Sequence, residues 1–462
     1  MIMKLASPRR GRAPGLVHQE VRMSRAMVGS LLLALLPLLS GRAAAQGFDL
    51  TVPGIMRGPE LYGREPQQVR WSADGRWLLF RWNEPGTPWR EPLRPYRVRA
   101  EAGARPERLD LALADSLAPL AEPGPRSPDG RRRVVSVRGD LYLVTLGTGE
   151  LRRLTDTRNA ETDPAWSADG RRVFFTRDGG NALELTLADA RIRQLTDIRP
   201  GPEPARDTAK TAQRAALARD ERALLGAVRD RLWQDSVARA ERDARDARGP
   251  KPLWLQKDER VVELAVSPTG AAALVLTETR AAKARDTRVP VFVAADGYTA
   301  DTAVRTKVGD EQATRRVGLM RLPSGETTWL DPLPQDSLPP SVLALRGWND
   351  AGTHALLLAI SRDNKTRVVS AVRADSAQVV PLETLRDPAW IGGPCFTCAG
   401  WVEQGRRAWY VSEADGWAHL YTVAPDGTGR RQLTRGDWEV LDVEAAPDGR
   451  TFRLHAREVS AH

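Results

Sequence analysis

The sequence predicts an all-β chain, a β-propeller of four-stranded antiparallel blades with one inserted amphipathic helix. Two observations carry this prediction. A turn motif with Asp-Gly between two β-prone runs recurs along the chain at intervals typical of propeller blades. Only one long segment, residues 206–248, has the composition and apolar spacing of a helix.

Each copy of the motif runs from an aromatic or small residue through Ser or Ala, a polar residue, Asp-Gly and a basic residue into alternating apolar residues. Gly supplies the positive φ that such a turn needs. The clearest copies are Trp71–Phe80, Ser127–Val135 and Trp166–Phe175, and weaker copies begin at Val266, Trp348, Trp401 and Ala446. A strand, turn and strand often follow, as at Leu141–Thr155, which completes a four-stranded unit.

The turn glycines are residues 75, 130, 170, 270, 352, 405 and 449. The two long spacings, of 100 and 82 residues, leave two alternatives open: each holds an unrecognised blade or an insertion. A β-sandwich is the other fold with this composition, but seven similar turns disfavour it. We expect seven to eight blades in the complete protein and an incomplete set in this chain.

Residues 206–248 are rich in Ala, Arg, Asp and Glu, without Pro and with Gly only at 226. Leu217, Leu224, Val228 and Leu232 fall on one helical stripe. We expect an amphipathic helix, broken near Gly226. The simpler interpretation is a solvated helix on the propeller rim, and the alternative is a helix that closes over a substrate opening or contacts a second domain.

Composition limits the function classes. The chain has 462 residues, 41% of them hydrophobic, and a mean hydropathy of −0.42, so it can bury a large core and is neither polytopic nor disordered. The net charge of +10 comes from 69 basic and 59 acidic residues. Because these charges alternate along the chain instead of gathering in one tract, we expect no nucleic-acid partner.

The N-terminus has the pattern of an export signal. Two arginines flank the apolar run Ala26–Leu39, and three alanines end at Ala45. The run is shorter than the roughly 20 residues of a spanning helix, and a proline interrupts it, so we expect cleavage before Gln46 and no stable membrane anchor. The export pattern needs no residue before Met23, so we expect Met23 as the alternative start of the protein. We expect residues 1–45 to form the signal region, residues 46–462 to form the propeller domain, incomplete at its C-terminus, and the product to be periplasmic or secreted.

Three stretches carry a resemblance to a known family: Asp387–Pro394, Ser412–Tyr421 and Gln432–Val440. They resemble the propeller of the dipeptidyl peptidase IV-like branch of the prolyl oligopeptidase serine peptidases. The resemblance implies an N-terminal propeller that caps a C-terminal α/β-hydrolase domain with a Ser–Asp–His triad and restricts access to peptides. It implies peptide substrates, no cofactor, and a homodimer as one assembly of the full-length protein.

The chain departs from that family in its chemistry. No Gly-x-Ser-x-Gly nucleophile elbow occurs in it, and His419 lies inside a blade motif, where packing or hydrogen bonding is the better interpretation. After Trp438 only the first hairpin of a blade follows. We therefore expect no catalytic residue in this chain, a truncated product that lacks the hydrolase domain, and no activity alone. The alternative is a stand-alone propeller of the TolB type that binds or scaffolds.

The dipeptidyl branch binds the substrate ammonium through a Glu-Glu pair, which this chain lacks. The acidic pairs in and just after the matching insertion are Asp220-Glu221 and Asp258-Glu259. Paired carboxylates suit an ammonium because two charges balance a desolvated cation better than one. Without a role in ammonium binding, the first pair is a charged patch on a helix surface and the second lies in a solvated turn.

Cys395 and Cys398 form a Cys-x-x-Cys pair. Such a pair is a local disulfide, a redox centre or half of a zinc site. Zinc needs two further ligands, and no second Cys pair or nearby His is present in the sequence. In an exported protein a disulfide is the favoured interpretation, and we expect no metal.

Overall fold

We describe a computed structural model of the chain. It describes residues 2–4, 51–56, 58, 63–204, 212–224, 226–246, 248–283, 285–307, 309–446 and 448–458. The expected signal run and the cleavage position between Ala45 and Gln46 lie outside these residues. No helix within the described ranges is long and apolar enough to cross a bilayer.

Antiparallel sheets follow one another along the chain. Blade 1 contains β2 (Gln67–Trp71), β3 (Trp77–Trp82), β4 (Arg94–Arg99) and β5 (Glu107–Arg108). Blade 2 contains β6 (Arg132–Val137), β7 (Asp140–Thr145) and β8 (Leu151–Arg153), with a bridge from Arg126 to Arg133 on its inner side. Blade 3 contains β9 (Glu161–Trp166), β10 (Arg172–Arg177), β11 (Asn181–Thr186) and β12 (Ile192–Gln194).

Three more units complete the series. Blade 4 contains β15 (Glu259–Val266), β16 (Ala272–Thr279), β19 (Thr314–Arg321) and β20 (Thr327–Leu330). Blade 5 contains β21 (Pro340–Trp348), β22 (His354–Ser361), β23 (Thr366–Arg373) and β24 (Val379–Arg386). Blade 6 contains β25 (Ala399–Val402), β26 (Arg407–Ser412), β27 (His419–Val423) and β28 (Arg431–Gln432). The terminal hairpin is β29 (Trp438–Ala445) with β30 (Thr451–Glu458), and β1 (Ile2–Lys4) pairs with β30.

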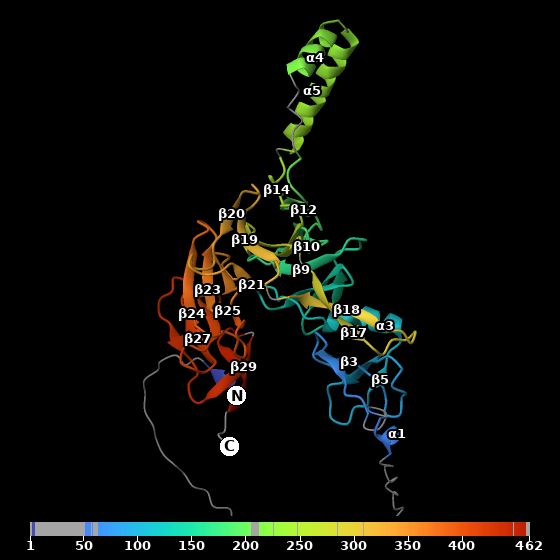
Figure 1. The fold of residues 1–462 in the computed structure, drawn as a ribbon. Helices are drawn as coiled ribbons and strands as arrows, with labels where there is room; N and C mark the ends of the chain where they lie inside the picture. Colours follow the sequence, from blue (N-terminus) through green and yellow to red (C-terminus); the bar gives the residue numbers. More distant parts are fainter. Residues whose placement is uncertain are drawn as a thin grey trace, which may run out of the picture.

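These sheets form a propeller-like all-β fold, as the sequence predicts. Figure 1 shows them along an open arc, with blade 1 and the terminal hairpin at its two ends. Apolar cores lie between neighbouring blades: Leu276 of blade 4 packs with Leu357 of blade 5, and Phe174 of blade 3 with Val275 of blade 4. The middle strands are covered on both faces, which is why β22 and β23 are almost continuous runs of buried residues.

The recurring motif forms the turn between the first two strands of a blade. In blade 1 the Ser72 hydroxyl donates to the Asp74 carboxylate at 2.5 Å and accepts from the backbone N–H of Trp77 at 3.0 Å. Gly75 has φ +69°, and all seven turn glycines have positive φ. The motif is therefore a side-chain-braced turn of four residues between Ser72 and Trp77, one type of hairpin reused along the chain.

Both long spacings between turn glycines hold insertions, which decides between the two alternatives left open by the sequence. The first contains the parallel pair β13 (Asp197–Arg199) and β14 (Pro252–Trp254), together with α4 (Ala212–Leu224) and α5 (Gly226–Asp246). The second contains the antiparallel ribbon β17 (Asp286–Val291) and β18 (Ala300–Thr306), inserted between β16 and β19.

The expected helix at 206–248 exists, with its break next to Gly226. The expectation that it lies on the rim is wrong, because α4 and α5 project away from the blades (Figure 1). Leu217 and Leu232 of the apolar stripe are exposed, so the described part of the stripe does not cover a blade. Two further helices lie outside this insertion: α3 (Leu111–Ala121) joins blades 1 and 2, and the short α1 (Val52–Ile55) precedes blade 1.

A buried ion pair lies within blade 5 and contacts blade 6. Arg367 donates to Glu383 at 3.0 Å and to the carbonyl oxygen of Val411, in blade 6, at 2.8 Å. Both charged side chains are almost fully buried. Burial lowers the pKa of Arg367 and raises the pKa of the neighbouring Tyr410 phenol. Arg367 thus links the two blades through its hydrogen bond to the Val411 carbonyl, while its ion pair with Glu383 lies within blade 5 and is costly to break from one side only.

Candidate functional site

A cavity of about 620 Å³ opens on the inner side of blades 3, 4 and 5. Its wall is formed by the inner strands β9, β15 and β21 and by residues 125–128 of blade 2. Aromatic and proline residues in its lining are Trp166, Phe175, Trp348, Pro125, Pro164 and Pro268, and the charged residues are Arg126, Asp163, Glu263 and Asp350. We call this space the axial cavity. A concave site that combines apolar walls with a small set of convergent polar groups is the usual form of a ligand site.

Asp163 enters the axial cavity at an irregular point of β9. Its φ is +52°, and the pairing of β9 with β10 shifts register between Phe174 and Thr176. The hydroxyls of Thr162 and Thr176 each donate to the Asp163 carboxylate at 2.8 Å. A bulge that redirects a side chain is common beside functional sites, and here it fixes one carboxylate in the cavity wall.

Glu263 supplies a second carboxylate from β15. The pairing of β15 with β16 also shifts register, between Val261 and Glu263. Glu263 is exposed, but desolvation by the surrounding wall raises the pKa of its carboxyl; the charge of Asp163 adds to this rise, while a hydrogen bond from the backbone of Leu345 and the charge of Arg346 oppose it. Glu263 and Asp163 are thus electrostatic neighbours, and a cation placed between them would relieve their repulsion.

The tryptophans of the wall also join the blades. Trp166 Nε1 donates to the carbonyl oxygen of Pro125 in blade 2 at 2.9 Å, and Trp348 Nε1 donates to that of Ala265 in blade 4 at 2.9 Å. We call this contact the interblade indole bond. It fixes the orientation of the two indole rings, so the apolar walls of the cavity are preformed.

The sequence-predicted residue Glu259 lies elsewhere, at the start of β15. Its side chain has no exposed surface, and Arg316 donates to its two oxygens at 2.7 Å each. Thr277 and the backbone of Gln256 also donate to it. Burial alone would raise the pKa of Glu259, but these hydrogen bonds outweigh it and lower the pKa. A substrate ammonium would have to compete with this complete set of partners.

The fold does not gather the other predicted carboxylates around the Glu259 side chain. Asp258 precedes β15 in a turn with φ +59°. Asp220 and Glu221 are exposed on α4, in the arm that projects from the blades (Figure 1). The two acidic pairs therefore sit in separate parts of the molecule.

Cys395 and Cys398 are joined by a disulfide. Asp442 lies near both sulfurs, the three ligand atoms falling within 4.8 Å of one another, but sulfurs bonded to each other are not thiolate ligands. The bridge packs against the core that joins blade 6 to the terminal hairpin. Its place indicates a local brace of that junction.

His419 has partners that suit a structural role. Its ring is buried, Nδ1 lies 3.1 Å from the Thr434 hydroxyl, and Nε2 lies 3.0 Å from the Gly436 carbonyl oxygen. The ring packs edge-on against Trp438. These contacts agree with the packing and hydrogen-bonding interpretation of this residue.

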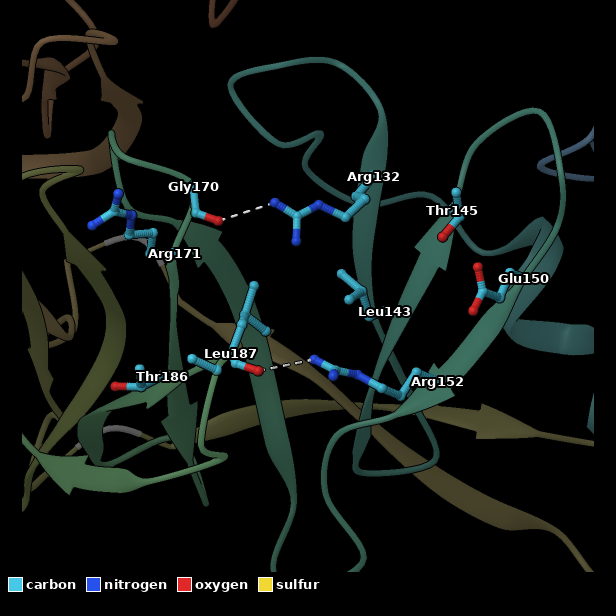
Figure 2. A pocket seen from close by; sticks show the side chains of 10 residues that line it. Arg132, Leu143, Thr145, Glu150, Arg152, Gly170, Arg171, Thr186 and Leu187 are labelled. Atoms are coloured by element: carbon cyan, nitrogen blue, oxygen red, sulfur yellow. Dashed lines mark hydrogen bonds between the residues drawn. The ribbon is translucent and has the colours of Figure 1, made fainter.

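A second open space, of about 540 Å³, lies between blades 2 and 3 (Figure 2). Arg132 reaches across it to the carbonyl oxygen of Gly170 at 3.1 Å, and Arg152 to that of Leu187 at 3.4 Å. Figure 2 shows the Arg171 side chain turning away from these two. Because both bridging arginines serve the junction between blades, we regard the axial cavity as the better candidate site.

The radial succession of four-stranded sheets places the chain among propeller-like all-β proteins. Residues 251–451 match the family described as "Dipeptidyl peptidase IV (DPP IV) N-terminal region", the same family that the sequence motifs resemble. "Dipeptidyl-peptidase 5" of Porphyromonas gingivalis is 33% identical over 69 residues, which are 13% of this chain and 10% of that protein.

Two solved structures are also similar. Dipeptidyl peptidase 4 of Porphyromonas gingivalis is 16% identical, with a TM-score of 0.43, over 82% of this chain and 48% of that one. A putative dipeptidyl aminopeptidase IV of Bacteroides ovatus is 13% identical, with a TM-score of 0.41, over 83% and 49%. The chain thus spans about half the length of these solved relatives and a tenth of the curated one.

Sequence reasoning missed Asp163 and Glu263. Each lies in an inner strand, seven residues before the turn glycine of its blade. That shared position was a usable signal, because residues at one place in successive blades face the same axis.

Proposed function

We propose that this chain is the substrate-gating N-terminal propeller portion of an exported serine exopeptidase or oligopeptidase, whose chemistry belongs to an α/β-hydrolase domain outside the chain. The match of residues 251–451 to the DPP IV N-terminal region carries the proposal. Two strands that line the axial cavity, β15 and β21, lie inside that region.

In this proposal the axial cavity receives a peptide chain. Its volume of about 620 Å³ suits a few residues of an extended peptide and excludes a folded domain. The tryptophan walls offer apolar contact, and Asp163 with Glu263 offers a partner for a cationic group. Binding and restricted access do not lower the chemical barrier by themselves, so the reaction still needs the hydrolase.

The role of Asp258, Glu259, Asp220 and Glu221 in holding a substrate N-terminus stays a prediction. The bidentate pair of Glu259 with Arg316 and the exposure of α4 weigh against it. Asp163 and Glu263 fit the same chemistry better, because both face one cavity. A homodimer of the full-length protein likewise stays a prediction.

Export belongs to the proposal as well. The apolar run and the alanines before Gln46 support a mature chain of residues 46–462 in the periplasm or outside the cell. Cleavage there would remove β1, which pairs with β30, and would leave β30 as an edge strand. N-terminal sequencing of the protein from its native host tests this: Gln46 as first residue agrees, and an intact N-terminus in the cytoplasm contradicts it.

Purified residues 46–462 test the enzymatic part. They should neither hydrolyse proline- and alanine-containing chromogenic peptides nor react with a fluorophosphonate, because a serine needs a base and an oxyanion hole to become a nucleophile. Turnover together with stoichiometric labelling of one serine would contradict the proposal.

A further inference from the structure

Arg362 is a cation with an unsatisfied donor. Its Nη2 atom is buried and has no hydrogen-bond partner among the described residues. The same residue lines a cavity of about 690 Å³, which we call the Arg362 pocket. Because most buried polar groups in folded proteins are paired, an unpaired guanidinium nitrogen beside a cavity indicates a site for a hydrogen-bond acceptor.

The Arg362 pocket lies at the boundary between blades 4 and 5. Blade 4 contributes Glu278 and Arg315, at the adjacent ends of β16 and β19. Blade 5 contributes Arg362, which follows β22. The third side comes from the chain between β18 and β19, with Lys307 and Asp310. No lining residue is shared with the axial cavity, so the two spaces are different sites.

Hydrogen bonds hold both walls of the pocket. The backbone N–H of Arg362 donates to the Pro339 carbonyl oxygen at 3.0 Å. On the opposite wall, Gln312 Nε2 donates to the Asp310 carbonyl oxygen at 3.0 Å, and Gln312 Oε1 accepts from the Thr306 hydroxyl at 2.8 Å. The pocket is therefore formed before a ligand enters, which lowers the entropy lost on binding.

One carboxylate of the lining is already compensated. Arg260 donates to Glu278 at 2.8 Å, and Arg315 donates to the other oxygen of the same carboxylate at 2.9 Å. Glu278 therefore neither attracts a ligand cation strongly nor competes for the guanidinium of Arg362.

The other charges of the lining are Arg362, Lys307 and Asp310. None of the three side chains forms an ion pair with a described residue. Two cations against one carboxylate leave a net charge of about +1, which a monoanion would balance. A guanidinium matches the planar shape of a carboxylate. A doubly charged phosphate would place excess negative charge near Asp310.

We propose that the Arg362 pocket binds the carboxylate of a small organic acid, with the Arg362 guanidinium as its main partner and Lys307 as a second cation. Asp310 opposes any second negative charge on the ligand. The free C-terminus of a peptide and a simple carboxylic acid both carry this group. The site does not depend on the proposed function, because its ligand needs no ammonium and touches no residue of the axial cavity.

Isothermal titration calorimetry of the full chain with N-acetyltriglycine tests the site. This probe has a carboxylate but no ammonium for Asp163 and Glu263. We expect saturable binding that Arg362→Gln weakens at least about tenfold, because a hydrogen bond to a charged group is lost. The C-terminal amide of the probe should lose affinity to the same degree. Arg171→Gln, which removes an exposed arginine outside the pocket, is the matched control and should bind like the wild type.

Two further variants keep the test independent of folding. Lys307→Gln changes an exposed side chain and should also weaken binding, whereas Asp310→Asn should tighten it. Arg362→Gln removes a cation without a partner, so it should not lower the urea midpoint of the free protein. The probe should raise the midpoint of the wild type and leave that of Arg362→Gln unchanged.

Unchanged binding by Arg362→Gln, equal binding of the acid and its amide, or no saturable binding would overturn the proposal. Tighter binding of inorganic phosphate than of N-acetyltriglycine would overturn the assignment to a carboxylate. Hexanoate separates the two sources of the group. Weaker binding of hexanoate than of N-acetyltriglycine supports a peptide C-terminus, and equal or tighter binding supports a simple carboxylic acid.

Discussion

The indole nitrogen of Trp348 donates a hydrogen bond to the carbonyl oxygen of Ala265 across the boundary between blades 4 and 5, at 2.9 Å. The two residues are 83 positions apart in the chain. The same side chain contributes to the wall of the axial cavity. One tryptophan therefore couples the stability of the blade junction to the shape of the candidate site.

Replacing this indole by a ring without a donor should weaken the junction. We expect Trp348→Phe to lower the free energy of unfolding by about 1–2 kcal/mol, because the Ala265 carbonyl loses a partner in a partly buried place. Urea unfolding measures it. Trp390→Phe, on an exposed loop, is the matched control and should change stability by less than about 0.5 kcal/mol. Equal effects of the two substitutions would contradict the structural role of the bond.

Glu259 should behave as a structural residue. Glu259→Gln removes the charge that Arg316 contacts at 2.7 Å and should cost about 2–3 kcal/mol of stability at neutral pH. Because the folded pKa of Glu259 is lowered, its contribution is present above the ordinary carboxyl pKa and is lost as the pH falls through the folded value. The difference between wild type and variant should therefore shrink in acid.

The control for Glu259 is Glu107→Gln, which breaks an exposed pair with Arg97 and should have little effect. If Glu259→Gln left stability unchanged and abolished peptide binding, the substrate-binding role predicted from the sequence would be supported against the structural one.

Removing one member of the ion pair between Arg367 and Glu383 should cost more stability than removing both. Arg367→Met leaves a buried carboxylate with a weaker partner and should cost about 3–5 kcal/mol. The double variant with Glu383→Met should recover most of this loss, since buried ion pairs are often replaceable by apolar packing. A double-mutant cycle of unfolding free energies measures the coupling, and strictly additive losses would disprove it.

Glu263 should make the protein less stable as the pH rises. Its folded pKa is raised, so the folded chain holds a proton that the unfolded chain releases between the ordinary and the raised pKa. Stability contributed by the protonated form is lost across that window. Glu263→Gln should remove this slope and stabilise the protein at neutral pH. Unfolding free energies of wild type and variant, measured from about pH 4 to pH 7, should converge at the acid end. Parallel curves would contradict this.

Local chemistry made the blades predictable. Ser72, Asp74 and Gly75 stabilise one turn within six residues of sequence, so the turn can be recognised from the sequence alone. The break beside Gly226 was visible for the same reason. The projection of α4 and α5 was not, because an apolar stripe such as Leu217 and Leu232 indicates a helix face without indicating what covers it.

The candidate site was less predictable because it is assembled across blades. Asp163 and Glu263 are 100 residues apart and meet only when β9 and β15 face one axis. The adjacent pair Asp258-Glu259 attracted attention through its neighbourhood in sequence. The carboxylate of Glu259 is instead hydrogen-bonded to Arg316, which lies 57 residues further along the chain. No local sequence pattern predicts that contact.

Peptide binding to the axial cavity tests the central claim most directly. Isothermal titration calorimetry of the chain with an unlabelled tripeptide amide should give one site, weakened at least about tenfold, or 1.4 kcal/mol, in the Asp163→Asn/Glu263→Gln variant. The Asp220→Asn/Glu221→Gln variant is the control with the same change of charge and should bind like the wild type. N-acetylation of the peptide should weaken binding to the wild type. Equal binding by wild type and the cavity variant, or no binding by either, would contradict the account.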